Sequence, residues 1–374
     1  MIIKHFKVTH LNQNDALNFD LHFNKDINVL TGKNGSGKTT LLKLIWYLIS
    51  GNIDRMISFM TEEALFEEIL IETNTFSLSI IRAETEGFSQ KNISVRWNIG
   101  KGEQHISIEA YAENGFYQFL NKEILNVSES SIFFPTFRRM EGGFFTSQPE
   151  IGVNRFYDAA RQRGRIYQTL DEGLDNLSKE LSVQKHHFIA SISTDDIVNF
   201  IARQYADISE RTNELQKELA KFITERTALA SSIDTEKDAL HDIQIKADEV
   251  TEKTEELLKP FTTLSKWVNS IFQYQGIKLT ENLTLGKATN ALSSDKLSSG
   301  EKQMLSFLCY NAFYSKGIIL IDEPELSLHV DWQRILFDVL MEQGTDNQFL
   351  IATHSPFIYS QFPDKELILD EGRK

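Results

Sequence analysis

Alternating apolar and polar positions near the start of the chain predict paired β-strands. Residues 17–23 alternate strictly, which is the period of a strand with one buried face. Residues 1–11 carry a similar mixture, so we expect the two stretches to form an antiparallel pair. Several short alternating stretches between residues 65 and 135 extend the pattern and predict a strand-rich lobe.

A different pattern begins after residue 26. Ile27–Thr31 is mostly apolar and ends at Gly32, which suits a buried strand. Residues 39–50 then have the apolar spacing of a helix, and Gly51 marks its end. This order of strand, loop and helix predicts an α/β layer beside the strand-rich lobe.

The middle of the chain carries a long heptad-like pattern. No proline occurs between Pro149 and Pro260, and steps of four and three from Ile201 to Leu257 give 17 positions, most of them apolar. The four exceptions are Thr212, Arg226, Glu236 and Thr254. The pattern favours a coiled coil, and amphipathic helices packed on a globular core are the alternative. A single helix of this length would carry the chain far from the point to which it must return, so we expect a helical hairpin that turns near residues 231–234. The heptad register nevertheless continues through that turn.

Composition narrows the class of protein. A length of 374 residues suggests two domains. The net charge of −14 argues against coating nucleic acid by bulk charge, although a local basic groove stays open. The single cysteine, Cys309, lies in an apolar stretch and is predicted to be a core residue, and no Cys/His cluster has the spacing of a zinc site. With no signal peptide and no membrane-spanning apolar run, we expect a cytoplasmic protein.

The stretch GKNGSGKT fits the pattern of a phosphate-binding loop, with a strand before it and a helix after it. Glycines let backbone N–H groups curl around phosphates, and the helix start adds positive partial charge. Lys38 would reach the β- and γ-phosphates, and the Thr39 hydroxyl would bind Mg²⁺. The pattern therefore predicts ATP and Mg²⁺ as cofactors. The predicted nucleotide-binding residues here are Gly32, Asn34, Gly35, Ser36, Gly37, Lys38, Thr39 and Thr40.

Two carboxylates follow a second buried strand. Residues 318–321 are apolar and mostly β-branched, which suits the centre of a parallel sheet, and they end at Asp322 and Glu323. Because the carboxyl ends of parallel strands face the ligand crevice, Asp322 would hold Mg²⁺ together with Thr39. Glu323 would polarise the attacking water. A solvated acidic turn is the alternative for the pair taken alone, and the P-loop motif favours the functional interpretation.

Four motifs in order resemble those of the ABC-type ATPases. They are GKNGSGKT, LSSGE (residues 297–301), ILIDEPE (residues 319–325) and IATHS (residues 351–355). Taken alone, LSSGE is a polar turn that starts a helix. It stands 24 residues before Asp322, counted from Ser298, which is the place of the signature motif in that family.

The resemblance implies a dimer. Heads of that family close face to face over two Mg-ATP, and the signature of one head contacts the γ-phosphate bound by the other. By position, this contact falls to Ser298, Ser299, Gly300 and Glu301. His354 takes the place of the switch histidine, so the implied catalytic residues are Lys38, Glu323 and His354. Residues 325–329 take the place of the loop that crosses the dimer interface.

The spacing of the motifs points to one branch of the family. Ser298 lies 260 positions after Lys38, and the interval contains the heptad pattern. This spacing is similar to that of the SMC, RecF and OLD branch, where a helical hairpin interrupts the head. Only 20 residues follow His354, so we expect no nuclease domain of the OLD type. A head of this kind resembles the standalone ATPase subunits of bacterial anti-phage systems such as PARIS and Septu.

The sequence thus predicts an α/β ABC ATPase head with an antiparallel side sheet, interrupted by an α-helical coiled-coil hairpin. The expected domains are an N-terminal lobe at residues 1–165, the helical insertion at 166–262 and a C-terminal lobe at 263–374. We expect a homodimer that regulates a separate nuclease or toxin in defence. A DNA-repair or DNA-loading ATPase of the RecF kind is the alternative.

Two arginine groups have more than one interpretation. Arg138 and Arg139 could contact nucleotide or a partner, or form ordinary surface ion pairs. The cluster of Arg155, Arg161, Arg163 and Arg165 could contact DNA or an acidic partner, or be a solvated helical face.

Overall fold

The computed structural model describes residues 1–11, 14, 17–56, 66–82, 93–99, 108–109, 115–136, 177–190, 194–229, 233–272 and 297–369. The chain divides into two compact units. The first unit comprises Met1–Ser191, Tyr314–Ile335 and Asp346–Lys374, and the second comprises Ile192–Phe313 and Leu336–Thr345. Both arginine groups and the domain boundary predicted at residue 165 lie outside the described residues. The three predicted domain ranges therefore stay a prediction.

The first unit contains an antiparallel side sheet with the strand order β2-β1-β4-β5-β6-β7. Its strands are β1 (Ile3–Thr9), β2 (Phe19–His22), β4 (Glu68–Thr73), β5 (Phe76–Arg82), β6 (Ile93–Ile99) and β7 (Ile108–Glu109). Strand β1 pairs antiparallel with β2, as the alternation predicted. The strand-rich lobe is likewise confirmed, although the helix α3 (Gly115–Val127) also belongs to it.

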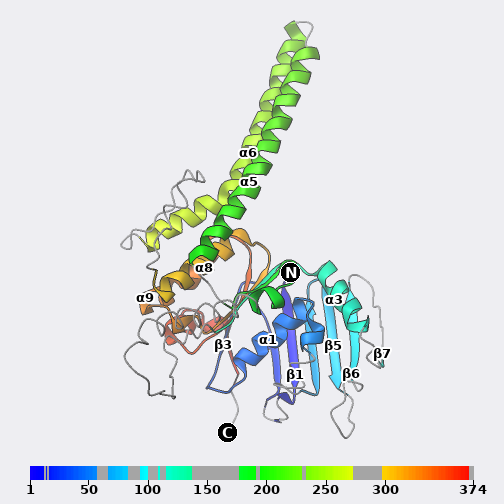
Figure 1. The fold of residues 1–374 in the computed structure, drawn as a ribbon, viewed down its shortest axis with the longest axis vertical. Coiled ribbons are helices and arrows are strands. Elements are labelled where there is room, and N and C mark those ends of the chain that lie inside the picture. The colour runs from blue at the N-terminus through cyan, green and yellow to red at the C-terminus, as the bar shows by residue number, and fades with distance from the viewer. Residues whose placement is uncertain are drawn as a thin grey trace, which may run out of the picture. The chain divides into compact units, whose positions relative to one another are not determined.

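The same unit contains a parallel sheet with the strand order β12-β3-β11-β10-β8-β9 (Figure 1). Its strands are β3 (Ile27–Thr31), β8 (Ser131–Phe134), β9 (His186–Phe188), β10 (Ile318–Asp322), β11 (Gln348–Ala352) and β12 (Glu366–Ile368). All neighbouring strands in this sheet are parallel. Strands β3, β10 and β11 are buried at every position, which explains their continuous apolar sequences.

Helix α1 (Lys38–Ile49) packs on the parallel sheet and fixes the start of the site. Trp46 on this helix is fully buried against the rings of Phe133 and Phe188. The helix ends before Gly51, which has a φ of 65°. A Cβ at Gly51 would lie 2.8 Å from Leu125 Cγ, so a glycine here permits the close approach of α3. The predicted α/β layer is confirmed.

A buried glutamine connects the two sheets. Gln348 Oε1 accepts a hydrogen bond of 2.8 Å from the Ile3 N–H, and its Nε2 donates one of 2.8 Å to the Ile3 carbonyl. The same Nε2 also lies 2.8 Å from the Asn24 carbonyl. Because a buried amide is stable only when it is hydrogen-bonded, Gln348 fixes β1 next to β11.

The second unit is built on the predicted helical hairpin. Helix α5 (Thr194–Leu229) is followed by α6 (Ile233–Ile271), so the turn falls where it was expected. Arg226 of α5 forms an ion pair of 2.9 Å with Asp242 of α6, which shows that the helices run antiparallel side by side. Each helix exceeds 35 residues, a length of roughly 54 Å or more at 1.5 Å per residue.

The hairpin departs from the predicted seam at Leu240 and contains a proline. Leu240 was placed in the seam, yet 67% of its surface is exposed, because the register does not continue unchanged through the turn. Helix α6 continues past Pro260 to Ile271. A proline inside a helix removes one hydrogen bond and favours a kink. Figure 1 shows the last part of α6, drawn in yellow, turning away from the hairpin axis.

Helix α8 (Ser299–Phe313) packs at the base of the hairpin. The ring of Phe200 on α5 stacks on Tyr310 at 4.7 Å, and the ring of Phe261 on α6 lies 4.8 Å from that of Phe313. Cys309 on the same helix is fully buried, as predicted. The helix that follows the signature sequence is therefore held by both arms of the hairpin.

Short elements complete the chain. They are η3 (Pro324–Leu326), α9 (Val330–Glu342), α10 (Pro356–Tyr359) and η4 (Pro363–Lys365). The division between the two units falls within α9. Within the described part of the chain, no helix has the length and apolar character needed to cross a membrane.

Candidate nucleotide-binding site

The P-loop residues form a closed turn between β3 and α1. Gly35 and Gly37 have φ values of 79° and 97°, which are left-handed conformations that glycine adopts without strain. The Lys38 ammonium lies inside this turn and donates hydrogen bonds to the carbonyls of Gly32 at 2.9 Å and Lys33 at 3.2 Å. The loop thus holds the positive charge of Lys38 at the N-terminus of α1, which favours bound phosphate.

The other predicted loop residues surround this turn. Ser36 is buried, and its hydroxyl lies 3.4 Å from the Lys38 ammonium. Asn34 is exposed at the outer edge of the loop, and Thr40 is half-buried on the first turn of α1. The structure therefore brings together all eight residues from Gly32 to Thr40 that the sequence assigned to nucleotide.

Asp322 lies between two hydroxyl groups at the end of β10. Its Oδ1 accepts a hydrogen bond of 3.1 Å from Thr39, and its Oδ2 accepts one of 2.5 Å from Thr136. Burial raises the pKa of Asp322, while the hydrogen bonds from Thr136 and Thr39 act in the opposite direction. A buried carboxylate flanked by hydroxyl oxygens has the oxygen donor set that Mg²⁺ prefers. The residues present therefore fit the predicted Mg²⁺ site.

Thr136 is a candidate site residue that the sequence did not reveal. It follows β8, whose residues pair in parallel register with β10, so the two strands end side by side. The available signal was the polar residue directly after the buried run Ser131–Phe134, next to a strand that ends in a carboxylate.

Glu323 adopts an unusual backbone conformation. Its φ of 48° and ψ of 58° place a non-glycine residue in the left-handed region, which costs on the order of 1 kcal/mol or more. Its N–H donates a hydrogen bond of 2.8 Å to the Ala352 carbonyl on β11. Its carboxylate lies 4.0 Å from His354 Nε2, and both side chains are partly exposed. The structure therefore brings the proposed base and the switch histidine together.

Glu325 fixes the loop that carries His354. Its carboxylate accepts hydrogen bonds of 2.6 Å from the His354 N–H and 2.8 Å from the Thr353 hydroxyl. The sequence placed Glu325 only in a segment expected to cross a dimer interface. The structure gives its side chain a local contact that positions His354.

The signature residues form the start of α8, in the second unit. Ser298 and Glu301 make a reciprocal capping box: Glu301 Oε2 accepts from the Ser298 N–H at 2.7 Å, and the Ser298 hydroxyl lies 3.3 Å from the Glu301 N–H. Ser298 and Ser299 are exposed, and Gly300 is buried. This arrangement presents a helix N-terminus with two hydroxyl groups to solvent, which suits an anionic ligand.

Several proteins are similar in sequence. The retron Vc95 probable ATPase of Vibrio cholerae is 21% identical, over 92% of this chain and 68% of that protein. Two further alignments are local. The endonuclease GajA of Bacillus cereus is 39% identical over 75 residues, 18% of this chain and 13% of that protein. The retron Ec83 probable ATPase of Escherichia coli is 30% identical over 107 residues, 25% of this chain and 20% of that protein.

Two Smc heads are among the solved structures that are similar to this chain. The Pyrococcus furiosus Smc head domain with an extended coiled coil, bound to part of ScpA, has 14% identity and a TM-score of 0.39, with 96% of this chain and 91% of that chain covered. A second Smc head bound to ScpA has 15% identity, a TM-score of 0.43 and the same coverage.

The AAA ATPase domain family matches residues 1–359. Because this match spans nearly the whole sequence, the chain belongs to the AAA ATPase domain family.

Proposed function

We propose that this chain is a Mg-ATP-dependent ATPase that works as a dimer and controls a separate effector, a nuclease or a toxin, in bacterial anti-phage defence. The observation that carries the ATPase part is the placement of Asp322 between Thr39 and Thr136, with Glu323 and His354 beside it. These groups supply the parts that phosphoryl transfer to water requires.

Each residue has one part in the proposed reaction. The loop amides and the Lys38 ammonium bind the β- and γ-phosphates of ATP. Thr39 and Asp322, with Thr136 beside them, would hold Mg²⁺, which when bound neutralises charge on the phosphates. Glu323 accepts a hydrogen bond from the attacking water and orients it toward the γ-phosphate. His354, held by Glu325, donates a hydrogen bond to a γ-phosphate oxygen.

The dimer is proposed from the second unit. Its signature turn at Ser298 and Ser299 is exposed and lies at the N-terminus of α8, where a helix has backbone N–H groups without partners within the helix. Such a turn can contact the γ-phosphate that a second copy holds on its P-loop. Hydrolysis would then depend on the pairing of two copies, and the nucleotide would decide whether the copies are joined.

The defence role rests on the relatives. Two of them are named as retron probable ATPases, and one of these aligns with 92% of this chain. A net charge of −14 suits an electrostatic contact with a basic effector protein. The effector would be held in one nucleotide state and released in another.

Affinity purification from native cells tests this function. We expect Glu323→Gln, which retains ATP, and Lys38→Ala, which does not bind it, to recover different amounts of one second protein. Recovery of no second protein with either variant or with the wild type would contradict the effector role. ATP-dependent, salt-sensitive duplex binding without a protein partner would instead support the DNA-loading alternative.

A further inference from the structure

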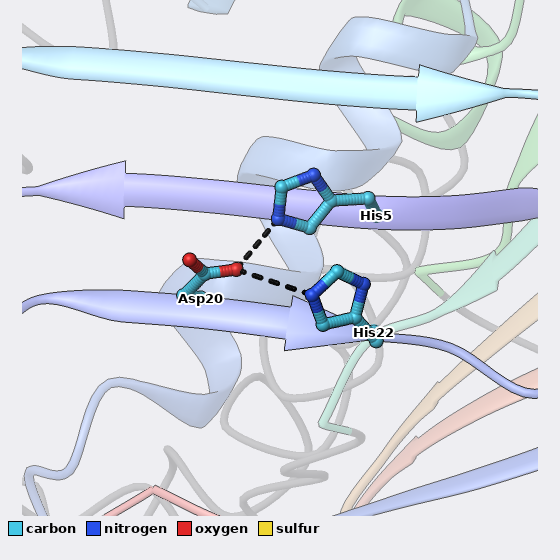
Figure 2. A group of neighbouring side chains, drawn as sticks. All are labelled: His5, Asp20 and His22. Carbon is cyan, nitrogen blue, oxygen red and sulfur yellow. Dashed lines mark hydrogen bonds and ion pairs between the residues drawn. The ribbon is translucent and has the colours of Figure 1, made fainter.

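Two histidines and one aspartate converge on the outer face of the side sheet. His5 on β1 lies directly opposite His22 on β2, and Asp20 is two residues from His22 on the same face. Asp20 Oδ1 lies 2.6 Å from His5 Nε2 and 3.7 Å from His22 Nε2. Figure 2 shows both rings directed at this one carboxylate.

The geometry points to a binding site for a transition-metal ion of the Zn²⁺ type, formed by His5, Asp20 and His22. One donor atom from each residue lies within 4.8 Å of the other two. Zinc bonds of about 2.0–2.1 Å at tetrahedral angles place neighbouring donors roughly 3.3–3.4 Å apart. The two separations from Asp20 fall on either side of this value, and the two imidazole rings stack with their centroids 4.4 Å apart. Rotation of the exposed His22 side chain would complete the site.

The ligand types favour zinc and its chemical neighbours over Mg²⁺ or Ca²⁺. Two imidazoles and a carboxylate suit Zn²⁺, Ni²⁺ or Cu²⁺, whereas Mg²⁺ and Ca²⁺ prefer oxygen donors alone. The site therefore differs in chemistry from the oxygen donors around Asp322. The side chains of His22 and Asp20 are 78% and 61% exposed, so a fourth position would be open to solvent.

A second carboxylate supports the orientation of His5. Glu72 on β4 is the register partner of His5, and its Oε2 lies 3.6 Å from His5 Nδ1. When Nε2 binds a metal, Nδ1 carries the proton. After a small shift of the side chains, this N–H can donate a hydrogen bond to the Glu72 carboxylate. Metal-bound histidines commonly have this second partner, which fixes the ring and increases its basicity.

A basic side chain beside this site, that of Lys7, is paired with another carboxylate. Lys7 is the register partner of Asp20 and could compete for its carboxylate. Its ammonium instead lies 3.3 Å from Glu68 Oε2 on β4. Asp20 is thereby shared by the two histidines.

A bound ion would fasten the outer strand of the side sheet. In the sheet order β2 is the terminal strand, and it pairs only with β1 among the described strands. The chain then continues from β2 into β3 and the P-loop. An ion held by His5 on one strand and by Asp20 and His22 on the other would resist separation of the pair.

Cobalt titration of the nucleotide-free and Mg²⁺-free full chain tests this site. We expect one equivalent of Co²⁺ to give visible absorption bands that added Zn²⁺ removes, and Zn²⁺ to raise the Tm. His5→Ala and His22→Ala should lose both effects, and Glu72→Gln should weaken binding by about 10-fold. His10→Ala is the matched control because His10 pairs with Glu67 next to the same sheet, and among the described residues it is not part of a group of three potential metal ligands; it should bind as the wild type does.

Two results would overturn the proposal. One is a wild type that takes up no Co²⁺ near neutral pH. The other is His22→Ala binding Co²⁺ with the same spectrum and affinity as the wild type. Because the His22 side chain is mostly exposed, its removal should not unfold the protein, and circular dichroism would verify this.

Discussion

Asp322 Oδ1 accepts a hydrogen bond of 3.1 Å from the hydroxyl of Thr39, a residue 283 positions earlier in the chain. Thr39 lies in the first turn of α1, and Asp322 ends β10. The contact therefore depends on the packing of α1 against the parallel sheet. It joins the two halves of the predicted Mg²⁺ site.

Replacing Asp322 should lower the rate of ATP hydrolysis without lowering the stability of the fold. We expect Asp322→Asn to lower ATP hydrolysis by roughly 100-fold or more, since a catalytic metal contributes several kcal/mol to the transition state. Burial raises the pKa of Asp322, so the wild type loses stability as pH rises above the ordinary range of a carboxyl group. The asparagine of the variant is uncharged and does not require the burial of a carboxylate. The variant should therefore have an equal or higher Tm without Mg²⁺. Steady-state rates and thermal unfolding measure the two effects, and a wild-type rate would contradict the assignment.

Thr136 should contribute to Mg²⁺ binding through Asp322. Thr136→Val removes a hydrogen bond to a charged group, which contributes about 1.5–3 kcal/mol, and should raise the Mg²⁺ concentration needed for hydrolysis on the order of 10-fold. Thr136→Ser keeps the hydroxyl and is the control. The Mg²⁺ dependence of the hydrolysis rate tests this role. Equal behaviour of the valine and serine variants would show that the hydroxyl is not involved.

Glu323 is predicted to be the general base. Glu323→Gln should reduce hydrolysis by about 10²–10⁴-fold, because a positioned base contributes this much, while ATP binding is retained. The matched control is Glu342→Gln, which changes an exposed carboxylate at the end of α9 and should leave the rate unchanged. Single-turnover hydrolysis and equilibrium ATP binding give the two readouts. Normal turnover by Glu323→Gln would show that the base is another group.

His186 should make the protein sensitive to acid. Burial lowers its pKa to about 3, and both ring nitrogens bond to serine hydroxyls, at 2.9 Å from Ser128 and 2.7 Å from Ser131. The folded state therefore binds this proton less readily than the unfolded state, and stability falls as pH drops from about 6.5 towards 3. At pH 5 the loss is about 2 kcal/mol from this group alone.

His186→Gln should remove that part of the acid sensitivity. The measurement is the difference in urea midpoint between about pH 7.5 and about pH 5. His241→Gln, at an exposed position on α6, is the control and should keep the wild-type difference. If both variants lose stability equally with acid, the buried imidazole is not responsible.

Sequence motifs predicted the parts of the site that are close together in the chain. The loop from Gly32 to Thr40 and the pair Asp322 and Glu323 follow buried strands, and the carboxyl ends of parallel strands meet at one sheet edge whatever the strand order. The contacts of Thr136 and Glu325 could not be predicted in this way. They depend on which strands are neighbours, and strand order follows from the full topology.

Dependence on tertiary pairing also explains the other features that the sequence did not predict. The heptad pattern predicted the hairpin, but an unbroken register could not indicate how the helices re-pair after the turn, so Leu240 was placed in the seam. Helix α6 stays helical beyond Pro260, where the ring of Phe261 packs against that of Phe313. His5 and His22 are not spaced as metal ligands in sequence, and only the pairing of β1 with β2 brings them together.

The central claim is that each reaction centre is completed by a second copy of the chain. Mixing two inactive variants tests it most directly. Lys38→Ala lacks a functional P-loop, and Ser298→Arg lacks a functional signature, but a dimer of one copy of each has one intact site. An equal mixture should recover roughly one quarter of the wild-type rate, because half of the dimers are mixed and each has one of two sites. No recovery on mixing, with a wild-type specific rate that stays constant on dilution, would contradict the claim.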